Sequence, residues 1–172
     1  DGTDDGLVSS SFSASSGNSC TIYITFRATS LPAGMVLLQQ TVGGTANTIA
    51  VQADNAPSLA SYFANPGGAF TYKRTTIAAT SYYQAAVVVD AALGATTPIA
   101  QYLNGVLGGA YIANAASNGG PLVASAWGLG ANPSASASFF NGKILDVLIF
   151  SRAHTAAEDA VVNAWLFEPA KL

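Results

Sequence analysis

The chain has 172 residues, of which 50% are hydrophobic and 9% are charged, and its formal net charge is −3. This length and composition suit a single domain with a sizeable core. The negative charge argues against nucleic-acid binding, which needs a basic surface, and no run approaches the roughly 18 apolar residues of a membrane helix. Cys20 is the only cysteine, so an internal disulfide is excluded.

The first half of the chain predicts short strands separated by turn residues. Residues 1–6, DGTDDG, are acidic and predict a flexible linker, with one domain over 7–172. We expect the chain to be a piece of a longer protein. Alternation is clearest in 20–28, where Ile22, Ile24 and Phe26 would share one face. The predicted strands cover 7–12, 20–28, 35–41, 48–53, 59–64, 70–77 and 82–90.

Two Asn-Gly pairs predict two-residue hairpin turns, because both residues enter the left-handed conformation cheaply. Asn104-Gly105 would join strands over 99–103 and 106–112. A strand over 122–127 is followed by a predicted turn at 128–130. Asn141-Gly142 would then open a last strand over 143–152, whose nearly continuous apolar run predicts cover on both faces.

The last strand and the segment after it carry four predicted structural side chains. Asp146 and Arg152 are an even number of residues apart, so we expect them on one face of the strand, with Asp146 bonded to Arg152 or to a nearby backbone group. Thr155-Ala-Ala-Glu158 is a capping box, in which each end bonds the backbone N–H of the other. A short helix should follow, with Val161, Val162, Trp165 and Leu166 on its apolar side.

About twelve short strands and one late helix predict an all-β fold, an antiparallel two-sheet β-sandwich of jelly-roll type with one short C-terminal helix.

The closing stretch 139–166 resembles that of the concanavalin A-like lectin/glucanase superfamily, in its laminin-G-like branch, where the pattern is F-x-G-x-I-x-E-V-x-I-[FY]-x-R-A-L-[ST]-x-x-E. Residues 30–40, SLPAGMVLLQQ, and 102–106, YLNGV, are similar to other parts of the same family. The resemblance implies a concanavalin A-like sandwich. The matching residues are Phe140, Gly142, Ile144, Asp146 (for Glu), Val147, Ile149, Phe150, Arg152, Ala153, Thr155 and Glu158, with His154 in place of Leu.

Catalytic residues are not expected. Glycosidases of the superfamily carry E-x-D-x-x-E, which supplies a nucleophile and a general acid on one strand, and this chain has no such stretch. Nucleophilic catalysis needs a base near a Ser or Cys, and we expect a structural role for the one histidine, His154. A zinc site would need several His or Cys ligands. The sequence therefore predicts that the chain is not an enzyme.

Sugar sites combine aromatic faces with a few amide or carboxylate groups. The residues predicted to contact a ligand are Tyr111, Tyr82, Tyr83 and Asn55, and one member of each adjacent aromatic pair, such as Tyr62-Phe63, should face the core. No cofactor is expected. Calcium, common in laminin-G-like and legume-lectin relatives, stays an alternative, and its candidate ligands are Asp54, Asn55 and Asp90.

The low charge, together with a resemblance to modules of phage virion proteins and bacterial surface adhesins, favours a non-catalytic adhesion or decoration module. We expect it on a virion or at the extracellular or cell surface, with a glycan or neighbouring virion or cell-surface proteins as its partners. It could form a homo-oligomer through the parent assembly. A purely structural capsid, tail or fibre component without a ligand stays open as an alternative, and so does a glycoside hydrolase relative.

Overall fold

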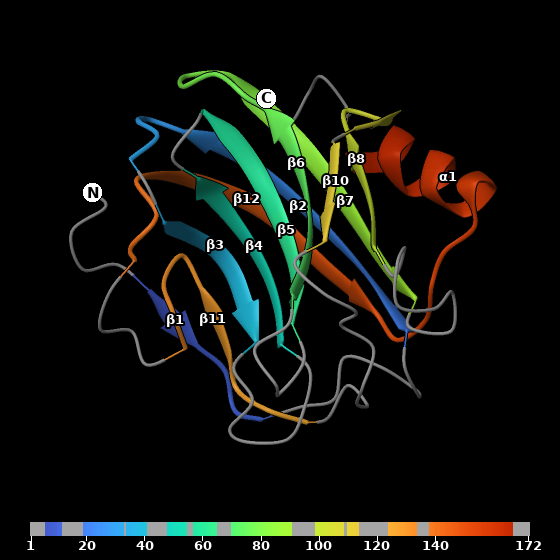
Figure 1. The fold of residues 1–172 in the computed structure, drawn as a ribbon, viewed down its shortest axis with the longest axis horizontal. Helices are drawn as coiled ribbons and strands as arrows, with labels where there is room; N and C mark the ends of the chain where they lie inside the picture. The colour runs from blue at the N-terminus through green and yellow to red at the C-terminus, as the bar shows by residue number, and fades with distance from the viewer. Residues whose placement is uncertain are drawn as a thin grey trace.

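The computed structural model describes residues 6–11, 19–32, 34–40, 48–54, 57–64, 70–90, 99–108, 110–113, 124–133 and 138–166. These form two antiparallel sheets and one C-terminal helix (Figure 1), which confirms the predicted β-sandwich. The predicted linker lies mostly outside the described residues, and the domain boundary stays a prediction. The strands are β1 Leu7–Val8, β2 Ser19–Ala28, β3 Met35–Gln40, β4 Thr48–Asp54, β5 Ser58–Ala64, β6 Phe70–Thr76, β7 Tyr82–Asp90, β8 Ile99–Leu103, β9 Val106–Leu107, β10 Ala110–Ala113, β11 Trp127–Leu129 and β12 Gly142–Phe150, and the helix is α1 Ala156–Leu166.

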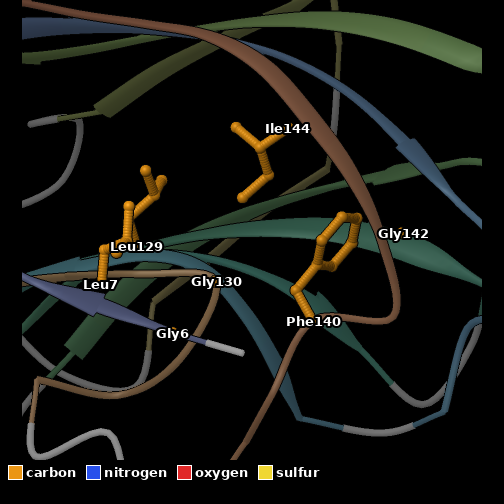
Figure 2. Close-up of a pocket in the computed structure, with 7 residues that line it drawn as sticks. All are labelled: Gly6, Leu7, Leu129, Gly130, Phe140, Gly142 and Ile144. Carbon is orange, nitrogen blue, oxygen red and sulfur yellow. The ribbon is translucent and has the colours of Figure 1, made fainter. Parts of the chain in front are cut away.

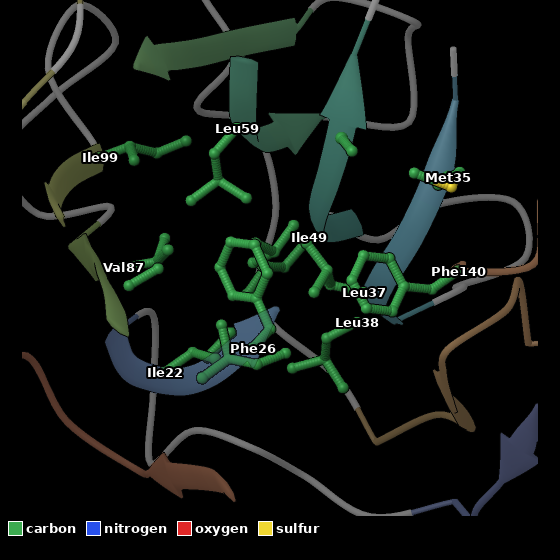
Figure 3. Close-up of a cluster of buried hydrophobic side chains, with 14 of the residues drawn as sticks. Ile22, Phe26, Met35, Leu37, Leu38, Ile49, Leu59, Val87, Ile99 and Phe140 are labelled. Atoms are coloured by element: carbon green, nitrogen blue, oxygen red, sulfur yellow. The ribbon is translucent and has the colours of Figure 1, made fainter. Parts of the chain in front are cut away.

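Seven strands form one sheet, in the order β1-β11-β3-β4-β5-β6-β10, and five form the other, in the order β12-β2-β7-β8-β9. The main core lies between the two sheets (Figure 3). Ile22, Ile24 and Phe26 share the inner face of β2, and each is fully buried. Burying a side chain of this size contributes about 1.5–3 kcal/mol relative to leaving it exposed. The alternation of apolar residues in 20–28 therefore determines which face of β2 is buried against the second sheet.

Helix α1, red in Figure 1, packs on the outer face of the five-stranded sheet, where Leu166 and Val162 contact a second cluster around Tyr23 and Ala86. The predicted apolar side of the helix is wrong in two places, since the side chains of Val161 and Trp165 are 71% and 52% exposed. The physical reason is that polar residues take part of the buried side of the helix. They are Asp159, which accepts a bond from Tyr23, and Asn163, which accepts one from Gln84.

The hairpin at Asn104-Gly105 joins β8 to β9, with both residues in the left-handed region at φ 51° and 76°. The second predicted hairpin, at Asn141-Gly142, is wrong. Neither residue has a positive φ, because the segment before β12 is not a paired strand. Phe140 N–H donates instead to the carbonyl of Gly130, and Asn141 accepts from Thr29 N–H, so the segment passes from one sheet to the other.

Gly142 is the first residue of β12 and pairs with Ala28. A Cβ at this position would lie 2.2 Å from the carbonyl oxygen of Arg27 and 2.7 Å from the Phe140 ring. Real side chains do not approach backbone this closely, so the structure needs glycine at 142 because the two chains are in close contact. The turn geometry inferred from Asn-Gly is not the reason.

The predicted strand over 106–112 divides between the two sheets. Val106–Leu107 pairs with β8 in the five-stranded sheet, whereas Ala110–Ala113 pairs with β6 in the seven-stranded sheet. Gly128 and Leu129, predicted as a turn, belong to strand β11 and pair with β3. The ends of short strands therefore depend on the partner strand as well as on local turn residues.

Strand β12 lies at an edge of its sheet, and its residues are half-buried or exposed, so the predicted cover on both faces is incomplete. A bulge between Ile144 and Asp146 leaves Leu145 40% exposed. The predicted bond between Asp146 and Arg152 is replaced by another ion pair, because the strand ends at Phe150 and Arg152 reaches forward to Glu158. Among the described residues, no helix has the length and hydrophobicity needed to cross a membrane.

Candidate functional site

Of the four residues predicted to contact a ligand, the structure describes the side chains of Tyr82 and Tyr83, which leave β7 on opposite faces. Tyr82 pairs with Arg27, whose guanidinium carbon lies 5.5 Å from the tyrosine ring centre. Tyr83 packs against the main core, and its hydroxyl accepts a 2.7 Å bond from the N–H of Ala78. Tyr111 lies in β10 opposite Lys73, and its side chain is outside the described part of the structure. Asn55 is also outside the described residues.

The candidate calcium ligands end two strands in different sheets. Asp54 is the last residue of β4 in the seven-stranded sheet, and Asp90 is the last residue of β7 in the five-stranded sheet. The side chain of Asp54 is not among those described. Within the described residues, no group of three or more His, Cys, Asp or Glu side chains could hold a metal ion. Calcium binding stays a prediction.

The outer face of the seven-stranded sheet carries a different group of aromatic and polar side chains. In β5, Leu59 and Phe63 are buried in the main core, so Ala60 and Tyr62 lie on the opposite face of the strand. The register of β3, β4 and β6 places residues of these strands on the same face of the sheet. We call it the tyrosine face and define it as Gln39, Ala50, Gln52, Ala60, Tyr62, Tyr72 and Arg74.

Two rows of cross-strand neighbours make up the tyrosine face. Gln39, Ala50, Tyr62 and Tyr72 lie opposite one another on β3, β4, β5 and β6. Because adjacent strands lie about 4.8 Å apart, Gln39 and Tyr62 stand roughly 10 Å apart on either side of Ala50. The rings of Tyr62 and Tyr72 are stacked, with their centres 5.1 Å apart and their planes at 29°.

The second row places Gln52, Ala60 and Arg74 opposite one another. The guanidinium carbon of Arg74 lies 5.2 Å from the centre of the Tyr72 ring. Both alanines of the face are nearly inaccessible, at 0% for Ala60 and 4% for Ala50, whereas the glutamine, tyrosine and arginine side chains are half-buried. These half-buried side chains carry two phenol rings, two primary amides and one guanidinium. These groups suit hydrogen bonding and stacking rather than acid–base chemistry.

Sequence reasoning considered Tyr62 and missed Tyr72, Gln39 and Gln52. The signal that could have found them is period-two alternation in 58–64 and 70–76, combined with the pairing of these two strands. The adjacent pair Tyr62-Phe63 divides as expected, with Phe63 in the core and Tyr62 on the outer face. The expected division also holds for Tyr82-Tyr83, where Tyr83 is the inward member.

His154 lies in a buried polar cluster beneath α1. Its Nδ1 is 2.9 Å from the hydroxyl of Tyr23, which also donates to Asp159. The His154 backbone N–H donates to Thr21, and its ring lies 4.4 Å from that of Phe150. Burial, followed by the hydrogen bond to Asp159, raises the pKa of Tyr23 above its ordinary value, so its phenol stays neutral. The cluster joins the helix to the sheet.

The family of the chain follows from a comparison with family models. The model described as the concanavalin A-like lectin/glucanases superfamily, Laminin_G_3, matches residues 1–158. The chain belongs to this family. The resemblance found in the closing segment is therefore confirmed, over most of the sequence. No relative was found among curated proteins.

Solved structures share the fold of this laminin-G-like chain at low identity. A heptameric SAP-like pentraxin from Limulus polyphemus is 12% identical with a TM-score of 0.67, over 92% of this chain and 75% of the pentraxin. The CBM40 of a Ruminococcus gnavus IT-sialidase, solved with α2,3 sialyllactose, is 16% identical with a TM-score of 0.64, over 91% of this chain and 97% of that one.

A third similar structure is domain 4 of a GH43 extracellular arabinanase from Geobacillus stearothermophilus, solved with arabinotriose. It is 16% identical with a TM-score of 0.64, over 92% of this chain and 72% of that chain. Identities this low establish the shared fold and leave the function of each member to its own residues.

The laminin-G-like closing motif of the chain contains both hydrogen bonds of a capping box. Thr155 N–H donates to Glu158 Oε2 at 2.9 Å, and Glu158 N–H donates to Thr155 Oγ1 at 3.4 Å. Arg152 pairs with the other carboxylate oxygen of Glu158. The hydrogen bond from Arg152, followed by those from Thr155, lowers the pKa of Glu158 to about 2.

A pocket of about 310 Å³ opens at the edge of this laminin-G-like sandwich, between β1, β11 and the start of β12 (Figure 2). Its side chains are apolar and belong to Leu7, Leu129, Phe140 and Ile144, and glycines 6, 130 and 142 complete the lining. A sugar needs side-chain hydrogen bonds, which this lining does not offer. The tyrosine face is therefore the better candidate for a polar ligand.

Proposed function

We propose that this chain is a non-catalytic carbohydrate-binding module and that the tyrosine face binds the sugar. The observation that carries the proposal is the stacked pair of Tyr62 and Tyr72 on the outer face of the seven-stranded sheet, beside the amides of Gln39 and Gln52. The sialyllactose and arabinotriose bound to two proteins of the same fold support it.

The arrangement suits a pyranose ring, which has an apolar C–H surface and a rim of hydroxyl groups. Tyr72 stacks on one side of Tyr62, and the other side of Tyr62 looks toward Ala50 and Gln39 on the neighbouring strands. A sugar can place its C–H surface on the tyrosine while its hydroxyl groups bond the amides of Gln39 and Gln52. The small Ala50 side chain adds no bulk between these groups.

Non-catalytic binding is also supported by the chemistry of the described residues. The two rows of the tyrosine face hold no pair of carboxylates of the kind that a glycosidase needs, and His154 is engaged with Tyr23 beneath the helix. The low proportion of charged residues, 9%, supports a place on a virion or cell surface. There the partner would be a glycan of a host or of a neighbouring surface.

The test is a glycan array with the whole 172-residue protein, run with and without calcium. Array hits are then titrated with Tyr62→Ala and Tyr72→Ala. We expect each variant to bind about tenfold more weakly, which corresponds to ~1.4 kcal/mol. Circular dichroism and the thermal midpoint show whether each variant is folded. Loss of binding in a chelator would support the calcium alternative.

Tyr82→Ala is the matched control, because Tyr82 is a half-buried tyrosine of the other sheet. It should leave binding unchanged, as should Tyr111→Ala. Binding that is lost in Tyr82→Ala or Tyr111→Ala and kept in Tyr62→Ala would place the site elsewhere. A blank array from the folded protein would overturn the proposed function and favour the structural virion component.

A further inference from the structure

Lys143, Arg27 and Tyr82 lie opposite one another on β12, β2 and β7, in one row across the five-stranded sheet. Phe26 and Ile144, next to this row in the chain, pack in the main core, so the row lies on the outer face of the sheet. We propose that the row is a binding site for a phosphate group, in which Arg27 and Lys143 bind the phosphate oxygens. The site is separate from the tyrosine face, which belongs to the other sheet.

The side chain of Arg27 is held in place and still offers hydrogen-bond donors. Its Nε donates to the carbonyl of Thr80 at 2.9 Å, and its guanidinium carbon lies 5.5 Å from the centre of the Tyr82 ring. Among the described residues, its two terminal nitrogens have no other partner, and neither is one of the buried atoms that lack a partner. Both nitrogens therefore reach solvent. Because the side chain is already restrained, less conformational entropy is lost on binding.

Thr80, which accepts the bond from Arg27, has a left-handed φ of 67°. Such a φ is a genuine outlier for a β-branched residue, and strained backbone of this kind clusters at functional sites. The N–H of Thr80 donates to the carbonyl of Ala28 at 2.7 Å, so the loop between β6 and β7 is bonded to the end of β2. The strained residue therefore fixes the loop and the guanidinium group together.

Lys143 adds a second cation directly opposite Arg27. Like charges that face each other across a ladder destabilise the sheet, and the chain has only 6 Lys and Arg in all. Lys143 is exposed, and its ammonium group has no partner among the described residues. Asp146 lies one row further along the same face, and no ion pair in the described part of the chain joins it to either cation. A bound anion would relieve the repulsion.

The two cations suit a phosphate better than a singly charged group. A phosphate monoester carries a charge of about −1.5 to −2 near pH 7, which balances both cations. Arginine presents paired donors in a planar fork and lysine presents a compact point charge, and both bind phosphate oxygens. The Cβ atoms of directly opposite residues lie about 4.5–5.5 Å apart, so both side chains can reach one anion. A carboxylate or a sulfate ester has one charge and would leave part of the repulsion.

The experiment follows the backbone amide signals of the whole 172-residue protein by NMR, at a constant ionic strength of about 0.15 M. The probes are inorganic phosphate, a monosaccharide phosphate and the sulfate ester of the same sugar. We expect saturable shifts at the three residues of the row, and binding of the sulfate ester that is at least about fivefold weaker. Arg27→Gln should weaken phosphate binding about tenfold or more. Arg27→Lys should recover part of the affinity, and Lys143→Gln should lose part of it.

Arg74→Gln is the matched control, because it removes the same charge and Arg74 lies over a tyrosine ring of the other sheet. It should leave phosphate binding unchanged, and the amide spectra show whether each variant is folded. Equal losses in Arg27→Gln and Arg74→Gln would overturn the site, since net charge alone would then explain the binding. The absence of saturable shifts, or equal binding of the phosphate and the sulfate ester, would also overturn it.

The two phosphate probes identify the source of the group. Tighter binding of the monosaccharide phosphate would support a site for a phosphorylated glycan, and equal binding of both probes would support a site for phosphate alone. Neither result depends on Tyr62 or Tyr72, whose variants test the proposed function. The phosphate site and the tyrosine face can therefore fail separately.

Discussion

The hydroxyl of Tyr23 donates a hydrogen bond to the carboxylate of Asp159, which joins the central strand β2 to helix α1. The two residues are 136 positions apart in the sequence. Both are buried, at 0% and 4% exposure. The second carboxylate oxygen, Oδ2 of Asp159, has no hydrogen-bond partner among the described residues. The position of the helix therefore depends on this phenol as well as on the Gln84–Asn163 hydrogen bond and the packing of Leu166.

Tyr23→Phe should lower the free energy of unfolding by about 1–3 kcal/mol, because it leaves a buried acceptor unpaired. Urea denaturation of Tyr23→Phe, Asp159→Ala and the double variant measures the coupling, which we expect at about 0.5–3 kcal/mol. Tyr82→Phe, which removes the hydroxyl of a half-buried tyrosine, should change stability by less than about 0.5 kcal/mol. Strictly additive effects of Tyr23→Phe and Asp159→Ala would contradict the account.

Acid should weaken the N-terminus of α1. The pKa of Glu158 is lowered from an ordinary value of 4.5 to about 2, first by Arg152 and then by Thr155. A carboxylate with a lowered folded pKa adds stability above its unfolded pKa, and this contribution is lost as pH falls from 4.5 through 2. NMR titration of the Glu158 carboxyl group should give the low value, and Arg152→Ala should return it toward 4.5. A midpoint near 4.5 with Arg152 intact would refute the pairing.

Gly142→Ala should destabilise the protein by about 1–3 kcal/mol through overpacking. The added Cβ would lie 2.2 Å from the backbone oxygen of Arg27, which cannot move without opening the β2–β12 ladder. Gly34→Ala is a useful comparison, since its Cβ would meet nothing within 4 Å and only its φ of 74° opposes alanine. Thermal unfolding of both variants tests this, and an unchanged midpoint for Gly142→Ala would contradict the close approach.

Asn104 in the β8–β9 turn combines a left-handed φ of 51° with a 2.9 Å hydrogen bond from Gln84 N–H to its side-chain oxygen. Asn104→Ala should lose the hydrogen-bond acceptor and disfavour the left-handed conformation. The conformational effect alone should lower the free energy of unfolding by about 1–2 kcal/mol. Asn104→Gly keeps the conformational freedom and loses only the acceptor, so it should be the more stable of the two variants. Chemical denaturation that gives equal values for both would remove the conformational part of this explanation.

Alternation and turn residues predicted the fold well where a strand is long and central. The predicted strand over 82–90 has the same bounds as β7, Tyr82–Asp90. The inner face of β2 was predicted correctly from the alternation of Ile22, Ile24 and Phe26. The helix start followed from Thr155 and Glu158, because a capping box is local. Local patterns could not show that Asp159 and Asn163 would face the sheet, since their partners Tyr23 and Gln84 are far away in the sequence.

The tyrosine face could not be predicted from local patterns for a similar reason. Tyr62 and Tyr72 become neighbours only through the register of β5 and β6, and Gln39 joins them only because β3 pairs with β4. A shift of one residue in any of these ladders would send the same side chains to the core. The face is thus a property of strand order and register, which a single sequence leaves open.

The place of β2 between β7 and β12 has a consequence for synthesis on the ribosome. One neighbour of β2, Tyr82–Asp90, is synthesised well before the other, Gly142–Phe150. Until then, one side of β2 offers unpaired backbone groups to any other extended chain. Nascent or truncated chains that lack β12 are therefore the species most exposed to intermolecular strand pairing, and holding them apart is a task for chaperones.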